Sequence, residues 1–388
     1  MNVSRRAYEN LPLSDRPRTW AEIDLPALRK NYRTLCKLLC GNAKPIAVVK
    51  ADAYGHGMAA CAKALFGEGC RRFAVSCVEE GIALRKTIGN EAEILILGYT
   101  DPASAPLLIR FDLSQTLLSS AYAEELCRAA ERSGGRVRVQ YALDTGMNRI
   151  GFPARGEREI AQTVADILRF CRESAFLSEG MFTHFACADD PGDPLTDLQS
   201  ARFSAVRALL LQNGVRLFCH CCNSAGAILR PQDHFNAVRL GILLWGISPA
   251  DQIRLPLSPV MRLCTRVAHL HCVEAGDRVG YGGAYRADRG ETIATFPIGY
   301  ADGWLRAYEG ATVTIETKSG PVRARLVGRI CMDQCMGNVT GFDVNVGDRV
   351  VLFGKDPNDL SALANRAETI PYESLCLISS RVPRVYQE

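Results

Sequence analysis

Short β-rich runs alternate with helical stretches from residue 46 to about residue 245, and this alternation constrains the fold more than any other feature of the chain. Eight strands that each precede a helix are typical of a (β/α)8 barrel. The expected strands are 46–50, 73–77, 93–97, 116–119, 137–143, 180–185, 217–222 and 237–242, and the expected helices are 58–65, 79–86, 122–132, 158–172 and 198–213. A doubly wound sheet is the alternative, but no GxGxxG sequence opens a helix after the first strand.

The pattern changes after residue 255. Pro256 and Pro259 interrupt it, and short β-rich runs separated by Gly, Asp and Pro follow. The expected strands there are 260–271, 292–297, 312–317, 323–328 and 349–352, with one helix at 360–367. We therefore expect a barrel domain at 1–255, with an N-terminal extension at 1–17, and a mainly β domain at 256–388. Residues 18–24 form a strand-like entry that could pair with either domain.

Charge and hydropathy exclude several classes of partner. The 46 Lys and Arg nearly balance the 42 Asp and Glu, which favours neither nucleic acid nor an acidic membrane surface. The longest apolar run, near 242–247, is far shorter than the roughly 20 residues that span a bilayer. The polar start lacks the apolar core of a signal peptide. We expect a cytoplasmic protein, although such a start also fits a linker after an upstream segment.

The chain has 16 cysteines, which raises the question of disulfides or zinc. In an enzyme of this size without an export signal, reduced thiols are the default. Cys219, His220, Cys221 and Cys222 resemble zinc ligands, but alternation along a strand would divide them between two faces. No second pair at two- to four-residue spacing completes a zinc site. We expect buried thiols there and no metal.

The segment AVVKADAYGHG, residues 47–57, ends the first expected strand with Lys50, and Tyr54 follows. A lysine amine forms a Schiff base with the aldehyde of pyridoxal phosphate (PLP), and a phenol can donate to its phosphate. For an isolated lysine, a solvated strand end would be the better interpretation. Here, further polar or small residues follow the ends of later strands, where barrel enzymes carry their chemistry. These are Arg149, His184, Asn223, Ser224, Arg239, Gly241 and Ile242.

From about residue 20 to residue 384 the chain resembles the alanine racemases, which are two-domain PLP enzymes. The matching stretches are AVVKADAYGHG, DTGMNRIG, FTHFACAD, NSAG, VRLGI, VGYGGAY, FPIGYADGW, GRICMDQCM and SRVPR. The resemblance implies a barrel followed by a β domain, and a head-to-tail homodimer with shared active sites. It also implies interconversion of L- and D-alanine, a small-molecule substrate, for the supply of peptidoglycan precursors.

By this resemblance, Lys50 and Tyr281 are the two catalytic residues, on opposite faces of the substrate, and Tyr281 comes from the partner subunit. A tyrosine with a pKa of about 10 is a poor base. His184, itself beside Arg239, would lower the cost of its deprotonation. Arg239 would face the pyridine nitrogen, and because arginine keeps its proton the ring would be a weaker electron sink.

The resemblance assigns three further groups of residues. The cofactor would be held by Lys50, Tyr54, His184, Asn223, Ser224, Arg239, Gly241, Ile242 and Ser380. The substrate would meet Arg149, which also contacts the cofactor, and the backbone N–H of Met332. The entrance would be lined by Tyr285, Tyr300, Asp189, Arg306 and Arg329. Packing inside the β domain is an equal alternative for Tyr300 and Trp304.

Two positions depart from the family pattern. Many members carry a lysine, often carbamylated, two residues before the Asp of DTGM, where this chain has Ala142. Arg149 must then be held by another group, such as a chloride, a water or an amide. Members usually have a tyrosine directly before RVPR, where this chain has Ser380. The lost ring opens space and adds a hydroxyl, so the alternative is a serine or dual alanine/serine racemase, as in glycopeptide resistance.

Two other functions compete with racemisation. A barrel decarboxylase for basic amino acids shares the cofactor and the two-domain plan. The spacing of Lys50 and Tyr54 and the YGGAY sequence around Tyr281 argue against it. A non-catalytic PLP carrier is usually a single barrel, which would leave the β domain without a purpose.

Overall fold

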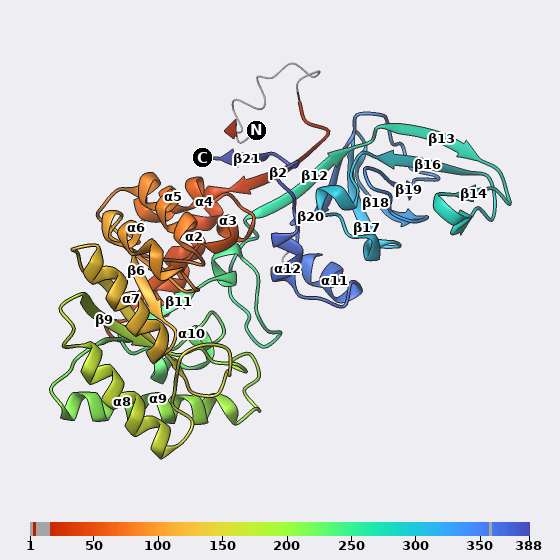
Figure 1. The fold of residues 1–388 in the computed structure, drawn as a ribbon. Helices are drawn as coiled ribbons and strands as arrows, with labels where there is room; N and C mark the ends of the chain where they lie inside the picture. The colour runs from red at the N-terminus through yellow and green to blue at the C-terminus, as the bar shows by residue number, and fades with distance from the viewer. Residues whose placement is uncertain (1–2, 5–15, 357–358) are drawn as a thin grey trace.

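The computed structural model describes residues 3–4, 16–356 and 359–388 (Figure 1). Eight parallel strands follow one another around a barrel, which closes where β6 pairs with β7. The strands are β3 (Lys44–Val48), β4 (Arg72–Val75), β5 (Glu93–Ile96), β6 (Ser114–Leu117), β7 (Val137–Asp144), β9 (Phe176–Phe182), β10 (Phe218–His220) and β11 (Ala237–Leu240). Each overlaps one expected strand, so the predicted (β/α)8 barrel is confirmed.

Helices surround the barrel (Figure 1). They are α2 (Leu25–Cys36), α4 (Met58–Gly67), α5 (Val78–Ile88), α6 (Ala105–Arg110), α7 (Ser120–Arg132), α8 (Glu157–Phe170) and α9 (Leu195–Gln212), with the short α10 (Gly226–Leu229). Local sequence explains where several begin. Asp24 accepts a hydrogen bond from the Ala27 N–H at the start of α2, and the Ser119 hydroxyl accepts one from Tyr122 at the start of α7.

A ten-stranded sheet forms the second part of the molecule. Its strands are β1 (Val3–Ser4), β2 (Thr19–Asp24), β12 (Met261–Arg266), β13 (His269–Val273), β16 (Glu291–Phe296), β17 (Thr312–Thr317), β18 (Gly320–Val327), β19 (Cys335–Asn338), β20 (Arg349–Phe353) and β21 (Arg384–Gln387). A small hairpin, β14 (Arg278–Val279) and β15 (Tyr285–Arg286), stands beside it. Two helices, α11 (Asp359–Arg366) and α12 (Pro371–Cys376), precede β21.

The entry strand belongs to this second sheet. β2 pairs antiparallel with β12 and parallel with β21. The chain therefore starts in the β sheet, forms the barrel and returns to the sheet. The expected division into 1–255 and 256–388 thus places β2 with the barrel, although β2 belongs to the other sheet. Most of the expected extension at 1–17 lies outside the described residues.

One expected strand, 260–271, was wrong as a single element. The chain pairs with β2 and β20 as far as Arg266 and then changes partner, pairing with β16 from His269 onward. Both halves are β-rich in sequence, and only the change of partner separates them. The main cluster of buried apolar side chains runs from the barrel, at Ile46 and Val48, into the sheet, at Val313 and Val350, and two smaller clusters lie in the sheet.

Arg384, the last residue of SRVPR, joins β21 to the barrel. Its side chain is almost fully buried, with 5% of its surface exposed. The guanidinium donates to the carbonyl oxygens of Gly55 (2.9 Å), Ile378 (2.8 Å), Ser379 (2.7 Å) and Val382 (2.6 Å). Because Gly55 lies just after Lys50, the C-terminal strand holds the turn that follows the first barrel strand.

We predict that Arg384→Met lowers the free energy of unfolding by about 3 kcal/mol, because four carbonyl oxygens lose a buried charged donor. Urea denaturation of the PLP-loaded protein measures the loss. Arg381→Met is the matched control in the same motif, since Arg381 is half-exposed and pairs with Asp333 at 2.7 Å. Equal losses in the two variants would contradict the structural role of Arg384.

Candidate active site

Lys50 begins a single left-handed helical turn, α3 (Lys50–Tyr54), rather than ending β3 as expected. Ala51, Asp52, Ala53 and Tyr54 have φ values of 52°, 52°, 57° and 54°. Residues with a Cβ avoid this region, at a cost of order 1 kcal/mol each. Such a turn persists only where the surrounding structure imposes it, so its supports bear directly on the position of Lys50.

Two carboxylates support the turn. Glu80 on α5 accepts hydrogen bonds from the Ala51 N–H (2.7 Å) and the Ser76 N–H (2.8 Å). Asp52 accepts one from the Met58 N–H (2.7 Å), which caps α4. With the Arg384 contact to Gly55, these bonds hold the turn on both sides. Sequence reasoning missed Glu80, because nothing in its own segment marks it as a partner of residue 51.

Tyr54, Ser224 and Gly241 converge on one small space. The Gly241 N–H donates to the Ser224 hydroxyl at 2.9 Å. A Cβ at position 241 would lie 2.6 Å from the Tyr54 hydroxyl and 3.8 Å from that of Ser224. Ile242 follows at the start of the 3₁₀ turn η4 (Ile242–Trp245). Two hydroxyls around a bare backbone fit a phosphate group.

Asn223 has a different role in the same loop. Its side-chain oxygen accepts from the Gly226 N–H at 2.9 Å, and its amide donates to the Phe185 carbonyl at 3.5 Å. These bonds shape the loop that carries Ser224. The cofactor contact expected for Asn223 stays a prediction.

Arg239 lies in the barrel interior without an ion-pair partner among the described residues. Its guanidinium donates to the carbonyls of His220 (3.1 Å), Cys221 (2.7 Å) and Thr183 (2.8 Å). It also meets Nδ1 of His220 at 2.6 Å and Nδ1 of His184 at 3.2 Å. Because arginine can only donate, both Nδ1 atoms must be unprotonated acceptors.

These contacts make the two imidazoles neutral. Burial, with the charge of Arg239, lowers the pKa of His184 to about 3, and the same two causes hold the pKa of His220 well below its usual range. Burial lowers the pKa of Arg239 only to about 10, so the guanidinium stays charged at neutral pH. Burial and the charge of Arg149 also lower the pKa of Lys50, which favours the neutral amine.

Helix α12 brings two residues that sequence reasoning missed. The rings of Tyr372 and Tyr54 lie 6.2 Å apart. Burial raises the pKa of Tyr372 to about 12, with a contribution from the charge of Asp189. Cys376 lies close enough to Lys50 for the two groups to shift each other's pKa values. Only the docking of α12 against α3 brings these side chains to the site.

The loop that carries Arg149 is held without the family lysine. Ala142 is buried on β7 opposite Phe182 of β9. Asp144 accepts from the N–H groups of Gly146 (3.1 Å) and Asn148 (2.9 Å) and so shapes the loop. Arg149 itself is exposed.

The predicted residues of the β domain gather on one exposed surface. Tyr281, 70% exposed, lies in the 3₁₀ turn η5 (Tyr281–Gly283), beside the guanidinium of Arg329. Tyr300 (45% exposed) and Met332 (54% exposed) lie on adjoining turns, since the Tyr300 N–H donates to the Cys331 carbonyl at 3.1 Å. In Figure 1 the neighbouring strand β14 lies at the end of the sheet remote from the barrel. A single chain therefore does not bring Tyr281 to its own Lys50.

The other residues expected at the entrance lie in different environments. The Tyr285 hydroxyl donates to Glu291 at 2.7 Å, while Arg306 is exposed. Ser380, expected at the cofactor, is exposed as well, and its contact with the cofactor stays a prediction. Asp189 is exposed on the barrel side. Trp304 is fully buried, 4.7 Å from the ring of Tyr308, so packing is its role.

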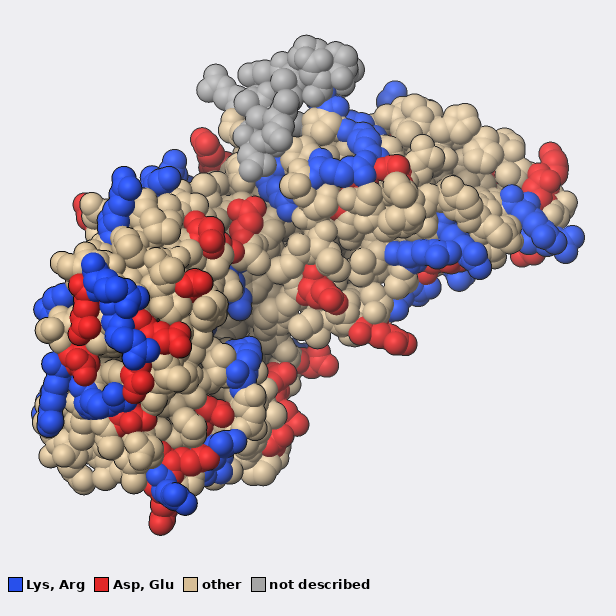
Figure 2. All heavy atoms as spheres, in the orientation of Figure 1, with Lys and Arg blue, Asp and Glu red and all other residues tan. Residues whose placement is uncertain are grey.

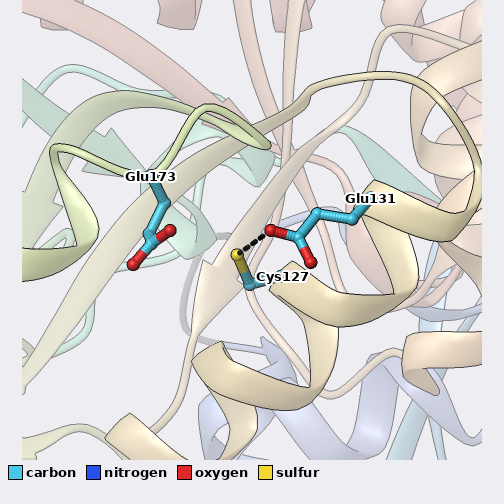
Figure 3. A group of neighbouring side chains, drawn as sticks. All are labelled: Cys127, Glu131 and Glu173. Atoms are coloured by element: carbon cyan, nitrogen blue, oxygen red, sulfur yellow. Dashed lines mark hydrogen bonds between the residues drawn. The ribbon is translucent and has the colours of Figure 1, made fainter.

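One group of possible metal ligands occurs among the described residues, formed by Cys127, Glu131 and Glu173 (Figure 3). Burial and the two carboxylates raise the pKa of the Cys127 thiol to about 11, which disfavours the thiolate that a metal requires. The zinc-like run at 219–222 does not assemble as a site. His220 is hydrogen-bonded to Arg239, and the thiols of Cys219 and Cys222 donate to backbone carbonyls.

The surface in Figure 2 carries interspersed positive and negative side chains, with a hollow between barrel and β domain. In the described part of the chain, no helix has the length and apolar character needed to cross a membrane.

Comparison with known proteins identifies the family. The family model "Alanine racemase, N-terminal domain" matches residues 23–249, and "Alanine racemase, C-terminal domain" matches residues 260–386. The chain belongs to the alanine racemase family. It is 41% identical to an alanine racemase of Symbiobacterium thermophilum, over 95% of this chain and 97% of that one. It is 38% identical to alanine racemase 1 of Clostridium acetobutylicum, over 95% of each chain.

Solved structures agree. An alanine racemase of Clostridium difficile superimposes with a TM-score of 0.88 at 38% identity and 96% coverage of both chains. The Bacillus anthracis enzyme with bound L-Ala-P gives 0.87 at 34% identity, covering 97% of this chain and 96% of that one. The chain is thus an alanine racemase, an isomerase of a family that uses PLP. The comparisons give no support to the serine alternative.

We predict that Gly241→Ala in this racemase raises the dissociation constant of PLP at least about tenfold, because the added methyl group fills the space between Tyr54 and Ser224. Titration of the cofactor-free protein with PLP measures the change. Gly67→Ala is the matched control, since a Cβ there meets no atom within 4 Å. Unchanged affinity in Gly241→Ala would contradict the phosphate assignment.

We predict a pH-dependent stability term from His56, which stacks on Trp245 at 4.4 Å. Burial lowers the pKa of His56 to about 3, whereas an unfolded histidine titrates near 6.5. Below pH 6.5 the unfolded chain takes up the proton first, so the free energy of unfolding falls as the pH drops toward 3. His56→Gln should reduce this slope by about 1.4 kcal/mol per pH unit between pH 6 and 4.

Urea denaturation at several pH values and one protein concentration measures the slope. His269→Gln, at an exposed position on β13, controls for the loss of one histidine from the unfolded chain. A slope in His56→Gln equal to that of the unaltered protein would refute the prediction.

Proposed function

We propose that this alanine racemase works by two-base proton transfer, with Lys50 on one face of the substrate and Tyr281 of the partner subunit on the other. The single observation that carries the proposal is the separation of these residues. Lys50 lies in a turn at the mouth of the barrel, whereas Tyr281 is exposed on the remote end of the sheet. A head-to-tail homodimer would unite them in two equivalent sites.

The residues at the barrel mouth suit PLP. The Lys50 amine would hold the cofactor, and Tyr54, Ser224, Gly241 and Ile242 would surround its phosphate. Arg239 would donate to the pyridine nitrogen. When bound, PLP supplies the electron sink that makes the Cα proton of an amino acid removable. A cationic arginine at the ring nitrogen weakens that sink, which limits competing reactions.

The electrostatic environments of Lys50 and His184 favour their neutral forms, which suits proton exchange. Burial and the charge of Arg149 lower the pKa of Lys50, which reduces the cost of the neutral amine that accepts a proton. Nδ1 of His184 accepts from Arg239, so Nε2 of its neutral ring carries the hydrogen and can donate to the Tyr281 oxygen. That hydrogen bond would stabilise the deprotonated tyrosine and ease its use as a base.

Other residues would bind the substrate and control its access. Arg149 and the backbone N–H of Met332 would meet the carboxylate, with Tyr300, Arg306, Arg329 and Asp189 around the entrance. Tyr285 is assigned to the entrance as well. The product D-alanine would supply peptidoglycan precursors. The cytoplasmic location expected from the sequence stays a prediction.

Mixing two inactive variants tests the shared site. Lys50→Ala and Tyr281→Ala should each abolish racemisation of L-alanine, followed by chiral separation. After dissociation and reassociation of an equal mixture, half of the dimers contain one chain of each kind. In each such dimer one site has both residues, so about a quarter of the unaltered activity should return.

A mixture in which the double variant Lys50→Ala/Tyr281→Ala replaces one partner is the control and should stay inactive. No recovery in the first mixture, with mixed dimers demonstrated, would show that each chain carries its own complete site. Racemisation by either single variant alone at the unaltered rate would refute the two-base assignment.

A further inference from the structure

A chain of buried hydrogen bonds leads from Arg239 across the barrel interior to Gln140. Nη1 of Arg239 lies 2.6 Å from Nδ1 of His220, and Nε2 of His220 lies 2.8 Å from Oε1 of Gln140. All three side chains are buried. His220 also stacks on Phe182, with ring centroids 5.0 Å apart and planes 7° apart. The imidazole is thus held at both nitrogens and on one face.

The direction of these bonds is determined. Arg239 can only donate, so Nδ1 of His220 accepts and the single hydrogen of the neutral ring lies on Nε2. That hydrogen requires an acceptor, which the Gln140 carbonyl oxygen provides. In the other tautomer, an N–H of His220 would face the N–H of Arg239 at 2.6 Å. Gln140 therefore accepts the hydrogen that this tautomer carries, which would otherwise be buried without a partner.

An irregularity in the neighbouring strand lies beside the Gln140 side chain. The pairing of β7 with β9 shifts register between Val139 and Gln140, so that β9 contributes one extra residue there. Gly180 lies opposite Gln140, and a Cβ at that position would lie 3.1 Å from the Gln140 oxygen and 2.6 Å from the Phe218 carbonyl. An irregular strand and a bare backbone together make room for this one amide.

We propose that Gln140 is a positioning residue of the racemase, which accepts the Nε2 hydrogen of His220 and so fixes the orientation of this ring and, through it, of the Arg239 guanidinium. The proposal rests on the proposed contact between Arg239 and the cofactor nitrogen. Gln140 lies remote from the strand ends that carry Lys50 and His184, so it acts only through His220.

A cavity beyond Gln140 guides the choice of variants. It has a volume of about 240 Å³, and its lining includes Gln140, Ser114, Arg138 and Glu179. A small residue at position 140 would admit water, which could replace the lost acceptor. Gln140→Leu is therefore the informative change, because it fills the space and accepts no hydrogen bond. Gln140→Glu keeps an acceptor oxygen.

The experiment uses the PLP-loaded enzyme with ¹⁵N-labelled imidazoles, of which the chain has six. In Gln140→Leu we expect the Nε2–H resonance of His220 to shift, because this hydrogen loses its acceptor, and the pH dependence of the cofactor absorption to change. We expect kcat for L-alanine to fall about tenfold, the effect of one buried hydrogen bond, with little change in KM. Gln140→Glu should keep the Nε2–H resonance and a kcat closer to that of the unaltered enzyme.

Gln115→Leu is the matched control. Gln115 is also a buried glutamine of the barrel wall, but its amide donates to the carbonyls of Gly98 and Thr116, both at 2.9 Å. It should lower stability without changing His220 or the cofactor absorption.

Three results would overturn the proposal. They are an unchanged Nε2–H resonance of His220 in Gln140→Leu, the same spectroscopic change in Gln115→Leu, and a Gln140→Glu variant that shows the same shift as Gln140→Leu. The last comparison decides the question if Gln140→Leu does not fold. Failure of racemisation in the unaltered enzyme would refute the proposed function instead, and the Nε2–H resonance of His220 is read without substrate.

Discussion

The contact between Arg384 and the turn after β3 is the interaction on which the site depends. Four consecutive residues after Lys50 adopt left-handed backbone conformations that they would not keep in isolation. Arg384 holds the Gly55 carbonyl from the C-terminal strand, and Glu80 and Asp52 hold neighbouring N–H groups. The last strand of the chain thus stabilises the turn that carries the lysine, and a hydrophobic cluster that runs from the barrel into the sheet joins the same two parts.

The second constraint is a buried cation without a carboxylate. Nη1 and Nη2 of Arg239 contact three carbonyls and two imidazoles, so both Nδ1 atoms accept and both rings stay neutral. A carboxylate in the same place would cancel the charge that the guanidinium presents to a bound ring. The neutral acceptors bind the guanidinium without cancelling its positive charge. Burying that charge costs free energy. His184 and His220 consequently stay neutral over the physiological pH range.

The third constraint is the division of the chemistry between two parts of the fold. Residues that would hold PLP lie at the mouth of the barrel, whereas Tyr281, Tyr300, Arg329 and Met332 form an exposed surface on the sheet. Neither surface is a complete racemase site. Two chains arranged with opposite polarity would complete both sites at once, and this makes assembly and catalysis inseparable in the proposed function.

The sequence by itself determined the eight strands of the barrel, because hydrophobic periodicity is a local property, and the family, because its motifs are contiguous stretches of the chain. Only the tertiary structure decided that β2 joins the C-terminal sheet, that α12 brings Tyr372 to Tyr54, and that Gln140 meets His220 across the barrel. It also decided that residues 51–54 turn left-handed. These features arise from contacts between residues far apart in the chain, and no local preference encodes such contacts.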